Sequence, residues 1–463
     1  MKTTVPNQYK AAGMVPVSDM RLTPAHFRML AICSMEQVIG TAMSALTGIV
    51  LPMILILDHH SMSSFIQGLV GASGLLGIAS GSLTLGKISD VKGYARLFRL
   101  CPLLITAGSV MPFIYPHTAM LVIGLFIVGF GVGGGYSLDS DYISELMPRK
   151  WSLFMVGVAK STCSLGFIGI SLCSYFIIKA HMEPEIWRWL MLLLTGLGVL
   201  TFMCRLRYPD SPKWLMDHGR DAEAQKAARF FFGPKAEVLP SETKKAAGPS
   251  ASWADMFRDG NWKKVVFSGI PWACEGVGVY GIGVFLPVLV MALGIDSTNA
   301  TGMSGILNSV ELSTVINCFI LPGFALGLLI VRRAYHVGML TWGFLFYSIG
   351  VGLVMAAYLL KWPVWISIIG FLMFEIALNA GPHLVTFIIP SQIYSVDERG
   401  AGSGLAAMIG KLGAILGVFL MPIVLDYGGM TAVLIFCISV GVLGMIVSAI
   451  FGRIVLPRSQ QKV

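Results

Sequence analysis

Two lysines lie deep inside apolar stretches of the sequence. Lys160 occurs in the run GVAKST, and Lys411 occurs in the run GKLG. A charged side chain within a membrane span is costly and usually faces a cavity or a partner rather than lipid. Two ammonium groups facing one cavity would bind an anion. The other interpretation is that each lysine pairs with a nearby carboxylate and only ties two helices together.

Carboxylates within apolar stretches are candidates for proton coupling. Glu36 lies in the first stretch, Glu275 in the seventh, and Asp139 toward the end of the fourth. Burial in a low-dielectric environment favours the protonated form of a carboxyl group, which can then bind and release a proton near neutral pH. A permanent ion pair with a lysine is the alternative. For Glu311 and Glu375, which also lie in apolar stretches, packing and functional roles both stay open.

Further candidates for substrate binding are a histidine and three aromatic residues in the same stretches. His383 would add positive potential to a cavity. Trp272 and Tyr280 belong to PWACEGVGVYG, whose proline and glycines loosen a helix so that it can line a cavity. Tyr136 follows the glycine run GVGGG. Packing against neighbouring helices or lipid is the alternative role for these aromatic rings.

The composition predicts that the elements carrying these residues are membrane-spanning helices. The chain has 463 residues, of which 55% are hydrophobic and 12% are charged. A soluble domain has roughly 25% charged residues, so the apolar excess must face lipid. The polar first 28 residues do not resemble a cleavable signal peptide. One span needs about 20 residues, and we predict twelve spans near residues 29–57, 65–88, 98–115, 118–147, 152–179, 187–206, 264–293, 304–330, 336–360, 363–394, 401–423 and 430–454.

Basic residues are distributed unequally between the two sides of these spans. With the N-terminus placed in the cytoplasm, the outward segments contain Lys179, Arg188 and Lys361, and the inward segments contain most other lysines and arginines. Cytoplasmic loops are enriched in Lys and Arg. This asymmetry predicts an even number of spans and two cytoplasmic termini, and it explains the net charge of +9 without nucleic acid as a partner.

A polar, charged stretch divides the chain into two halves. We predict a cytoplasmic N-terminal segment (1–28), an N-terminal six-helix bundle (29–206), a cytoplasmic linker with short helices (207–263), a C-terminal six-helix bundle (264–454) and a cytoplasmic tail (455–463). The predicted fold is an all-α membrane protein of two pseudo-symmetric bundles.

The segment after the second span carries a recognisable motif. Residues 86–99 read GKISDVKGYARLFR, which resembles the GxxxDxxGRRxxxR signature of the major facilitator superfamily. Glu145, which precedes Pro148, is similar to a glutamate of that family that ties span ends to basic loop residues. The resemblance implies a conformational gate formed by Asp90, Arg96, Glu145 and Arg149.

A second set of motifs narrows the resemblance. PDSPKWL (209–215) and WRW (187–189) resemble elements of the sugar porters and their relatives among organic-ion transporters. The stretches 131–145, 381–394 and 399–414 resemble the phosphate:proton and metabolite:proton symporters. The resemblance implies alternating access between two six-helix halves, usually driven by a proton gradient. Those phosphate symporters have other side chains where this chain has Gly135, His383 and Gln392, which argues against inorganic phosphate.

These observations predict proton-coupled symport of a small organic anion, a carboxylate or a phosphorylated metabolite. A lysine at position 160, near the place of a sugar-binding glutamine in the sugar porters, argues against a neutral sugar. The alternative is proton-coupled efflux of a drug, siderophore or metabolite. An enzyme is not expected, because HExxH, GxSxG and P-loop motifs do not occur. We expect a monomer in the cell inner membrane, with the substrate, protons and lipid as partners and no cofactor or metal, since the eight cysteines are scattered without a CxxC.

Overall fold

The computed structural model describes residues 15–16, 21–59, 61–148, 150–234, 236–237, 253–258, 260–294, 302–331, 333–395 and 398–457. These residues are almost entirely helical. The exception is a parallel pair of two-residue strands, β1 (Val15–Pro16) and β2 (Ala236–Glu237). The fold is therefore that of a helical bundle, as predicted.

The N-terminal half forms six spans, two of which are interrupted. They run through α2 (Pro24–Cys33) with α3 (Met35–Leu57), α4 (Ser64–Lys92), α5 (Tyr94–Ile114), α6 (Thr118–Leu146), α7 (Ser152–Ser161) with α8 (Cys163–His181), and α9 (Trp187–Arg205), which follows a short 3-10 turn at Pro184–Ile186. Each is apolar enough and long enough to cross a bilayer.

The C-terminal half repeats this pattern. Its spans run through α12 (Trp262–Gly276), the π-helix η4 (Val277–Ile282) and α13 (Gly283–Ala292), then α14 (Gly302–Cys318) with α15 (Ile320–Ile330), α16 (His336–Leu359), α17 (Val364–Ala380) with α18 (Pro382–Ile393), and α19 (Arg399–Val455). The 57 residues of α19 would extend about 85 Å. At Gly429 the backbone is non-helical, with φ 64°, and this break divides α19 into two spans. The described residues thus confirm twelve spans.

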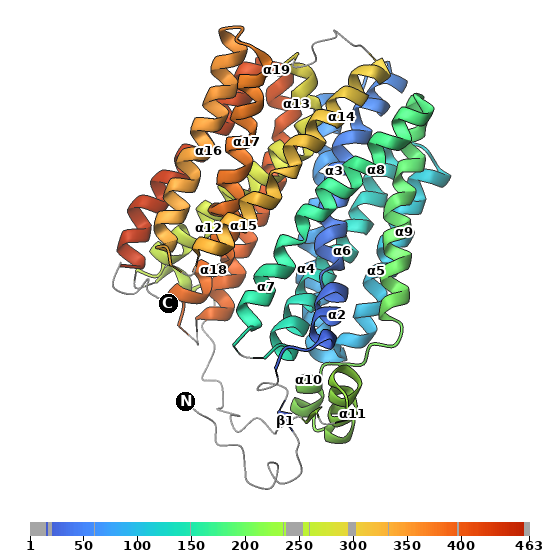
Figure 1. Ribbon diagram of the computed structural model, residues 1–463, viewed down its shortest axis with the longest axis vertical. Coiled ribbons are helices and arrows are strands. Elements are labelled where there is room, and N and C mark those ends of the chain that lie inside the picture. Colours follow the sequence, from blue (N-terminus) through green and yellow to red (C-terminus); the bar gives the residue numbers. More distant parts are fainter. Residues whose placement is uncertain are drawn as a thin grey trace.

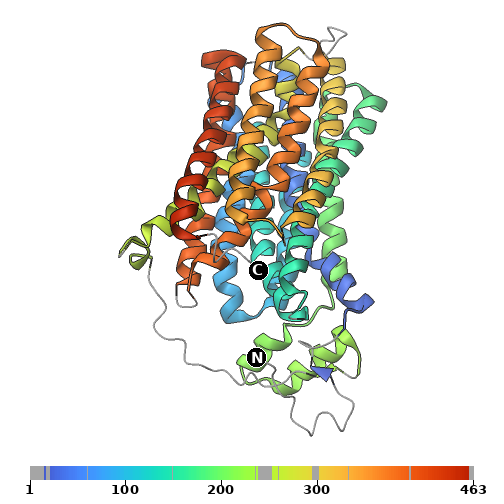
Figure 2. The ribbon, with the colours of Figure 1, turned by 60° about the vertical axis from the view of Figure 1, so that its left-hand side comes forward.

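The two halves lie side by side as separate bundles whose helices run along the long axis of the molecule (Figures 1 and 2). Two short helices, α10 (Pro212–Asp217) and α11 (Asp221–Phe232), lie beneath the N-terminal half. Ser211 caps α10 by accepting a hydrogen bond from the Trp214 amide, and Pro212 occupies its first turn. We call the end of the molecule that carries α10 and α11 the linker end and the opposite end the far end.

The apolar core shows where the two halves meet. One buried cluster at the far end contains residues of both halves, such as Ile49 and Val50 of α3 with Val284 and Phe285 of α13. Toward the linker end, a second cluster belongs to the N-terminal half with α10 and α11, and a third belongs to the C-terminal half with the 3-10 turn Asp255–Phe257. The halves therefore share a core at the far end and have separate cores at the linker end.

Two glycines allow the close approach of the halves at the far end. A Cβ added to Gly48 would lie 1.6 Å from the backbone oxygen of Val284, and one added to Gly68 would lie 2.3 Å from the backbone oxygen of Phe419. Small residues are what permits helices to pack this tightly in a membrane. The far end is thus closed by backbone-to-backbone packing of α3 with α13 and of α4 with α19.

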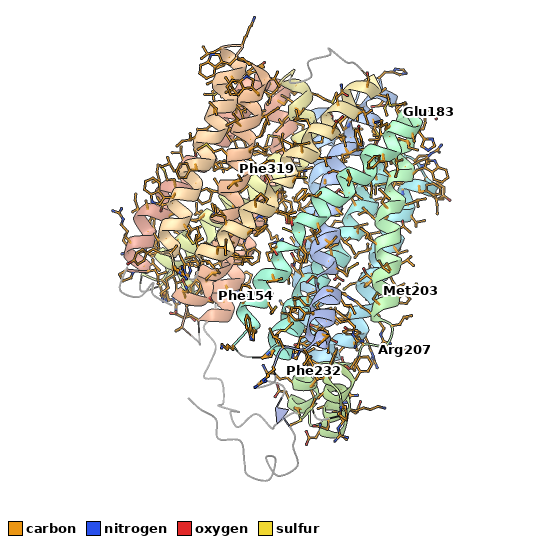
Figure 3. The ribbon with its side chains drawn as sticks, in the orientation of Figure 1. Phe154, Glu183, Met203, Arg207, Phe232 and Phe319 are labelled. Atoms are coloured by element: carbon orange, nitrogen blue, oxygen red, sulfur yellow. The ribbon has the colours of Figure 1, made fainter. Side chains whose placement is uncertain are left out.

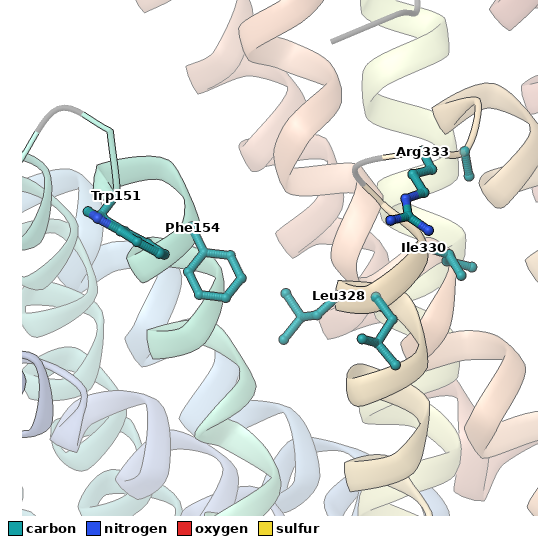
Figure 4. Close-up of a pocket in the computed structure, with 7 residues that line it drawn as sticks. Trp151, Phe154, Leu328, Ile330 and Arg333 are labelled. Carbon is teal, nitrogen blue, oxygen red and sulfur yellow. The ribbon is translucent and has the colours of Figure 1, made fainter.

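The linker end is open between the halves. A cavity of about 740 Å³ separates Trp151 and Phe154, near the start of α7, from Leu328, Ile330 and Arg333 near the end of α15. Figure 4 shows the two groups facing each other across this space, and Figure 3 places Phe154 at the gap between the bundles. We call this space the mouth cavity. Its presence and the closed far end describe a conformation open to one side.

Candidate functional site

Lys160 and Lys411 come from opposite halves and approach the same aromatic ring. The Lys160 Nζ lies 5.9 Å from the centre of the Tyr136 ring, and the Lys411 Nζ lies 5.3 Å from it. Both side chains are half-buried, and neither forms an ion pair with a carboxylate in the described part of the chain. An aromatic face attracts a cation, but it does not neutralise the charge. Two ammonium groups that make no direct contact with a carboxylate among the described residues therefore meet between α7 and α19.

Aromatic side chains surround these two lysines. The Lys160 Nζ lies 4.6 Å from the Phe387 ring centre, and the Lys411 Nζ lies 6.0 Å from that of Tyr280. Trp272 packs on Phe387, with ring centres 4.8 Å apart. Phe387 is 43% exposed although it lies in a span. We call this group of side chains, which come from α6, α7, η4, α12, α18 and α19, the central chamber.

Glu275 supplies the negative charge of the central chamber. Its side chain is buried, and its Oε1 lies 3.5 Å from Nδ1 of His383. The charges of Lys160 and Lys411 both act on Glu275. The π-helix η4 begins two residues after Glu275, and the regular helix is interrupted at Gly381, between α17 and α18. Such interruptions of regular helix often mark functional sites, and here they direct Glu275 and His383 to each other.

Glu36 and Asp139 lie in a different cluster, within the N-terminal half. Arg205, at the end of α9, makes a short bidentate contact with the Glu36 carboxylate, and its Nη2 lies 3.1 Å from Oδ1 of Asp139. Nη2 also donates to the backbone oxygen of Ile32, at 2.8 Å, and the guanidinium lies 3.6 Å from the Phe98 ring centre. All three charged side chains are fully or almost fully buried. We call Glu36, Asp139 and Arg205 the buried triad.

The glycine at position 135 makes room for the buried triad. A Cβ there would lie 2.2 Å from Cγ of Glu36. A side chain at this position would therefore displace Glu36 from Arg205. In the other half, Gln392 of α18 and His336 of α16 are within hydrogen-bond distance, with 3.0 Å between Oε1 and Nδ1. At Gly135 and Gln392, where this chain differs from the phosphate symporters, the residues of this chain thus support contacts between its own helices.

The predicted gate contacts the linker. Oδ1 of Asp210 accepts a hydrogen bond from the Ala95 amide, at 2.6 Å, and Gly93, with φ 87°, forms the turn beside it. Glu145 accepts a short hydrogen bond from Ser211 and lies 3.7 Å from the ammonium of Lys213. The segment 209–215 thus joins the start of α5 to the end of α6.

The other predicted gate residues make no hydrogen-bond or ion-pair contact with the linker among the described side chains. Arg96 is exposed. Asp90 lies in α4, but its side chain is outside the described part of the chain, as is all of Arg149. A gate role for Asp90, Arg96, Glu145 and Arg149 stays a prediction.

Comparison with known proteins identifies the family. Residues 25–458 match the family described as sugar (and other) transporter. The chain belongs to this transporter family. It is a multi-pass membrane transporter of the major facilitator superfamily, and the prediction that it is not an enzyme is confirmed by the family.

Relatives of the transporter carry diverse names. The inner membrane metabolite transport protein YgcS of Escherichia coli (strain K12) is 29% identical over 388 residues, which are 84% of this chain and 82% of that protein. The inorganic phosphate transporter PHO84 of Saccharomyces cerevisiae is 22% identical over 426 residues, covering 80% of this chain and 70% of that protein. The glucose transporter GlcP of Staphylococcus epidermidis is 22% identical, covering 83% and 85%.

Solved structures confirm the fold. A partially occluded inward open conformation of the xylose transporter XylE from E. coli matches with a TM-score of 0.75, at 16% identity, over 94% of this chain and 98% of that chain. The proton:xylose symporter XylE bound to 6-bromo-6-deoxy-D-glucose matches with a TM-score of 0.71, at 16% identity, over 93% of this chain and 96% of that chain. At this identity the likeness establishes the arrangement of helices and nothing about the substrate.

An ion pair outside the spans, between Glu398 and Lys264, predicts how the stability of the transporter depends on pH. Glu398, just before α19, accepts hydrogen bonds from the Lys264 ammonium at 2.8 Å and from the Asn261 amide at 3.1 Å. The hydrogen bond from Lys264 lowers the pKa of the Glu398 carboxyl below its ordinary value. A carboxyl group whose pKa is lower in the folded than in the unfolded state stabilises the fold at pH values above its unfolded-state pKa. This stabilisation is lost as the pH falls through the folded-state pKa.

We therefore expect Glu398→Gln to lower the thermal stability of the purified transporter at pH 7 and to make a progressively smaller difference as the pH falls below 4. The expected cost at pH 7 is about 1 kcal/mol or less, because the pair is partly exposed. Thermal unfolding followed by intrinsic fluorescence measures it. Glu223→Gln is the matched control: its pair with Arg220 is exposed, and no change is expected. A constant difference from pH 7 to pH 3 would contradict this role for Glu398.

Arg205 is a candidate functional residue that its position in the sequence does not reveal. It lies at the end of the sixth span, two residues before the exposed Arg207, and a basic residue there looks like an ordinary topological charge. Glu36 and Asp139 were selected as proton-coupling candidates, but their partner could not be named because their rotational positions on α3 and α6 are not visible in the sequence. Phe387, which contacts Lys160, was also missed.

Proposed function

We propose that this transporter couples the movement of a small organic anion to the movement of protons. The observation that carries the proposal is the meeting of Lys160 and Lys411 at the Tyr136 ring without carboxylate partners. A charge that is half-buried in a span is costly when it is unpaired. An anionic substrate that enters the central chamber would supply the missing partner for both ammonium groups.

The charge balance of the central chamber sets the class of substrate. Two lysines and Glu275 leave one net positive charge when Glu275 is ionised and two when it is protonated. A carboxylate or a phosphorylated metabolite fits this balance, whereas a neutral sugar leaves it uncompensated. The aromatic rings of Trp272 and Phe387 offer apolar faces beside the lysines, as ligand pockets commonly do for the non-ionic part of a substrate.

The buried triad supports the coupling to protons. Glu36 and Asp139 carry two negative charges and Arg205 carries one positive charge, so the ionised triad has one uncompensated negative charge in an apolar core. A buried net charge is strongly disfavoured, and binding of one proton removes it. Oδ2 of Asp139 has no hydrogen-bond partner among the described residues, which makes it a suitable position for this proton. Glu275 is the second proposed proton carrier, beside the substrate.

The mouth cavity and the closed far end support alternating access by rocking of the two halves. The linker end carries the basic loops that the positive-inside rule places in the cytoplasm. Under this assignment the structure is open to the cytoplasm, and Glu145 with Ser211, Lys213 and Asp210 forms part of the gate that reorganises at this end.

The proposal predicts proton-driven uptake that depends on Glu275. The transporter reconstituted in liposomes is given a mixture of isotope-labelled monocarboxylates, sugar acids, sugar phosphates and neutral sugars, with an inward proton gradient. We expect accumulation of an acidic compound that stops when a protonophore collapses the gradient. Glu275→Gln should abolish accumulation but retain exchange of labelled for unlabelled substrate.

Glu183→Gln, at an exposed position of the far end (Figure 3), is the control and should accumulate substrate normally. Accumulation of a neutral sugar in place of any acid would contradict the anion assignment. Accumulation that survives the protonophore would contradict the coupling. If the acid instead leaves the liposomes while protons enter them, the transporter is an exporter rather than an importer.

A further inference from the structure

A small cavity with a few polar groups lies where α17 and α18 of the C-terminal half meet α8 of the N-terminal half, next to the central chamber. Its volume of about 10 Å³ is close to the space that one water molecule needs. Its polar walls come from Asn317 of α14, Glu375 and Asn379 of α17, and His383 of α18, and Cys163 of α8 closes it from the other half. We call it the α17 cavity. Of these residues, His383 also contacts Glu275 in the central chamber.

Glu375 is a buried carboxyl group without a cationic partner. Its side chain is 4% exposed. Asn379 donates to Oε2 at 3.0 Å from Nδ2, and no lysine, arginine or histidine forms an ion pair with Glu375 within the described ranges. This differs from Glu36, which has Arg205. An unpaired buried carboxylate is costly enough that the group takes up a proton instead.

Two more polar atoms at the α17 cavity lack partners. Oδ1 of Asn317 and Nδ1 of His383 have no hydrogen-bond partner among the described residues, although both side chains are only 3% exposed. Buried polar groups are normally satisfied by protein or by ordered water. One water molecule in the cavity can donate one hydrogen bond to Oδ1 and the other to Nδ1. The cavity therefore suits a water that links Glu375 to His383.

We propose that Glu375 is a proton-binding site of the C-terminal half, protonated in this conformation and connected to Glu275 through the cavity water and His383. In the transfer, the O–H bond of the Glu375 carboxyl breaks and its proton passes to the water, while the water gives a proton to Nδ1 of His383. Glu375 becomes a carboxylate and His383 an imidazolium. A small rotation of the His383 ring then turns the Nδ1–H from the water to Oε1 of ionised Glu275, which lies 3.5 Å from Nδ1, and Glu275 takes that proton and leaves His383 neutral.

The surroundings favour a proton over a metal cation. The positive charges of Lys160 and Lys411 act on His383, and the amide of Asn379 directs a donor rather than an oxygen at Oε2. No group of three or more His, Cys, Asp or Glu side chains that could hold a metal occurs in the part of the chain that the structure describes.

Among the residues that the structure describes, the other elements packed around α17 add no charged side chain in contact with Glu375. From α16, the Tyr347 hydroxyl is engaged with the backbone oxygen of Cys437, at 3.1 Å, and from α15, the Phe324 ring covers His383. Cys163 of α8 is a neutral thiol on which Glu275 and Glu375 both act electrostatically. Protonation of Glu375 is therefore governed by burial, by Asn379 and by exchange with His383.

Infrared difference spectroscopy of the full-length protein in lipid tests this inference. At pH 7 the difference between the wild-type and Glu375→Gln spectra should contain the C=O stretch of a protonated carboxyl group that shifts in heavy water, separate from any band of the buried triad. Glu311→Gln, on the exposed face of α14, is the matched control and should leave the band unchanged. Asn379→Ala, which keeps Glu375, should shift the frequency of the band because the hydrogen bond to Oε2 is lost.

The inference is overturned if the difference between the wild-type and Glu375→Gln spectra lacks this band, or if Asn379→Ala leaves its frequency unchanged. It is also overturned if sodium ions, compared with potassium ions, raise the thermal stability of wild-type protein but not of Glu375→Gln, since the site would then hold a metal cation. The spectrum needs no substrate, so failure of proton-driven uptake and failure of this inference are separate results.

Discussion

The Arg205→Met variant is expected to lose most of its folded yield and to unfold at a much lower temperature than the wild-type protein. The substitution leaves Glu36 and Asp139 in an apolar core without their guanidinium partner. Breaking a buried ion pair by removal of one partner costs on the order of 3–5 kcal/mol, because the remaining charge is uncompensated. Yield of monodisperse protein and its thermal unfolding measure the effect.

Two further variants distinguish the loss of the Arg205 charge from a general loss of packing. Removing the charges of the carboxylates as well, in Glu36→Gln/Asp139→Asn/Arg205→Met, should restore most of the stability. Arg207→Met is the control, since Arg207 is exposed beside the linker (Figure 3), and it should behave like the wild type. Equal instability of the single and triple variants would show that Arg205 acts through its shape rather than its charge.

The second large effect is expected at the central chamber. Lys160→Met and Lys411→Met should each weaken the binding of an acidic substrate about 10- to 100-fold, because a hydrogen bond to a charged group contributes roughly 1.5–3 kcal/mol. The double variant should show no detectable binding. Substrate exchange in liposomes without a proton gradient measures this, since exchange depends on binding and rocking but not on coupling.

The controls for this experiment come from the same chain. Lys179→Met removes a lysine that is exposed at the far end, where its ammonium lies 3.5 Å from the Tyr175 hydroxyl, and it should exchange substrate normally. Lys411→Arg keeps the charge and should retain more binding than Lys411→Met. If both methionine variants exchange the acid as well as the wild type does, the lysines only tie helices together.

Much of the fold could be predicted from the sequence because the bilayer simplifies it. Long apolar runs have to become helices, and the alternation of basic loops sets their number and direction. The loosened helix expected at PWACEGVGVYG is the π-helix η4. The two motifs at residues 86–99 and 209–215 were recognised separately. Their contact, through Asp210 and Ala95, could not be foreseen, because the sequence does not show how the linker folds back on the bundle.

The candidate site was less predictable because it depends on rotation about helix axes. The types and depths of Lys160, Lys411 and Glu275 indicated functional candidates, and in the structure both lysines lie over the Tyr136 ring and act electrostatically on Glu275. Glu36 was a proton-coupling candidate like Glu275, yet it lies in another cluster with Arg205, which resembled a topological charge. Glu375 was visible as an intramembrane carboxylate, but the cavity beside it arises from residues of α8, η4, α13, α14, α15 and α18 as well.

The most direct test of the anion assignment compares two ligands of the same carbon skeleton, an organic acid and its neutral amide. The acid used is the one that exchanges fastest in liposomes, and its binding is measured by titration calorimetry and thermal shift. The assignment predicts that the acid binds and stabilises the wild-type transporter, that the amide does not, and that the acid has no effect on Lys160→Met/Lys411→Met. Equal binding of acid and amide to the wild type, or unchanged binding of the acid to the double variant, would contradict it.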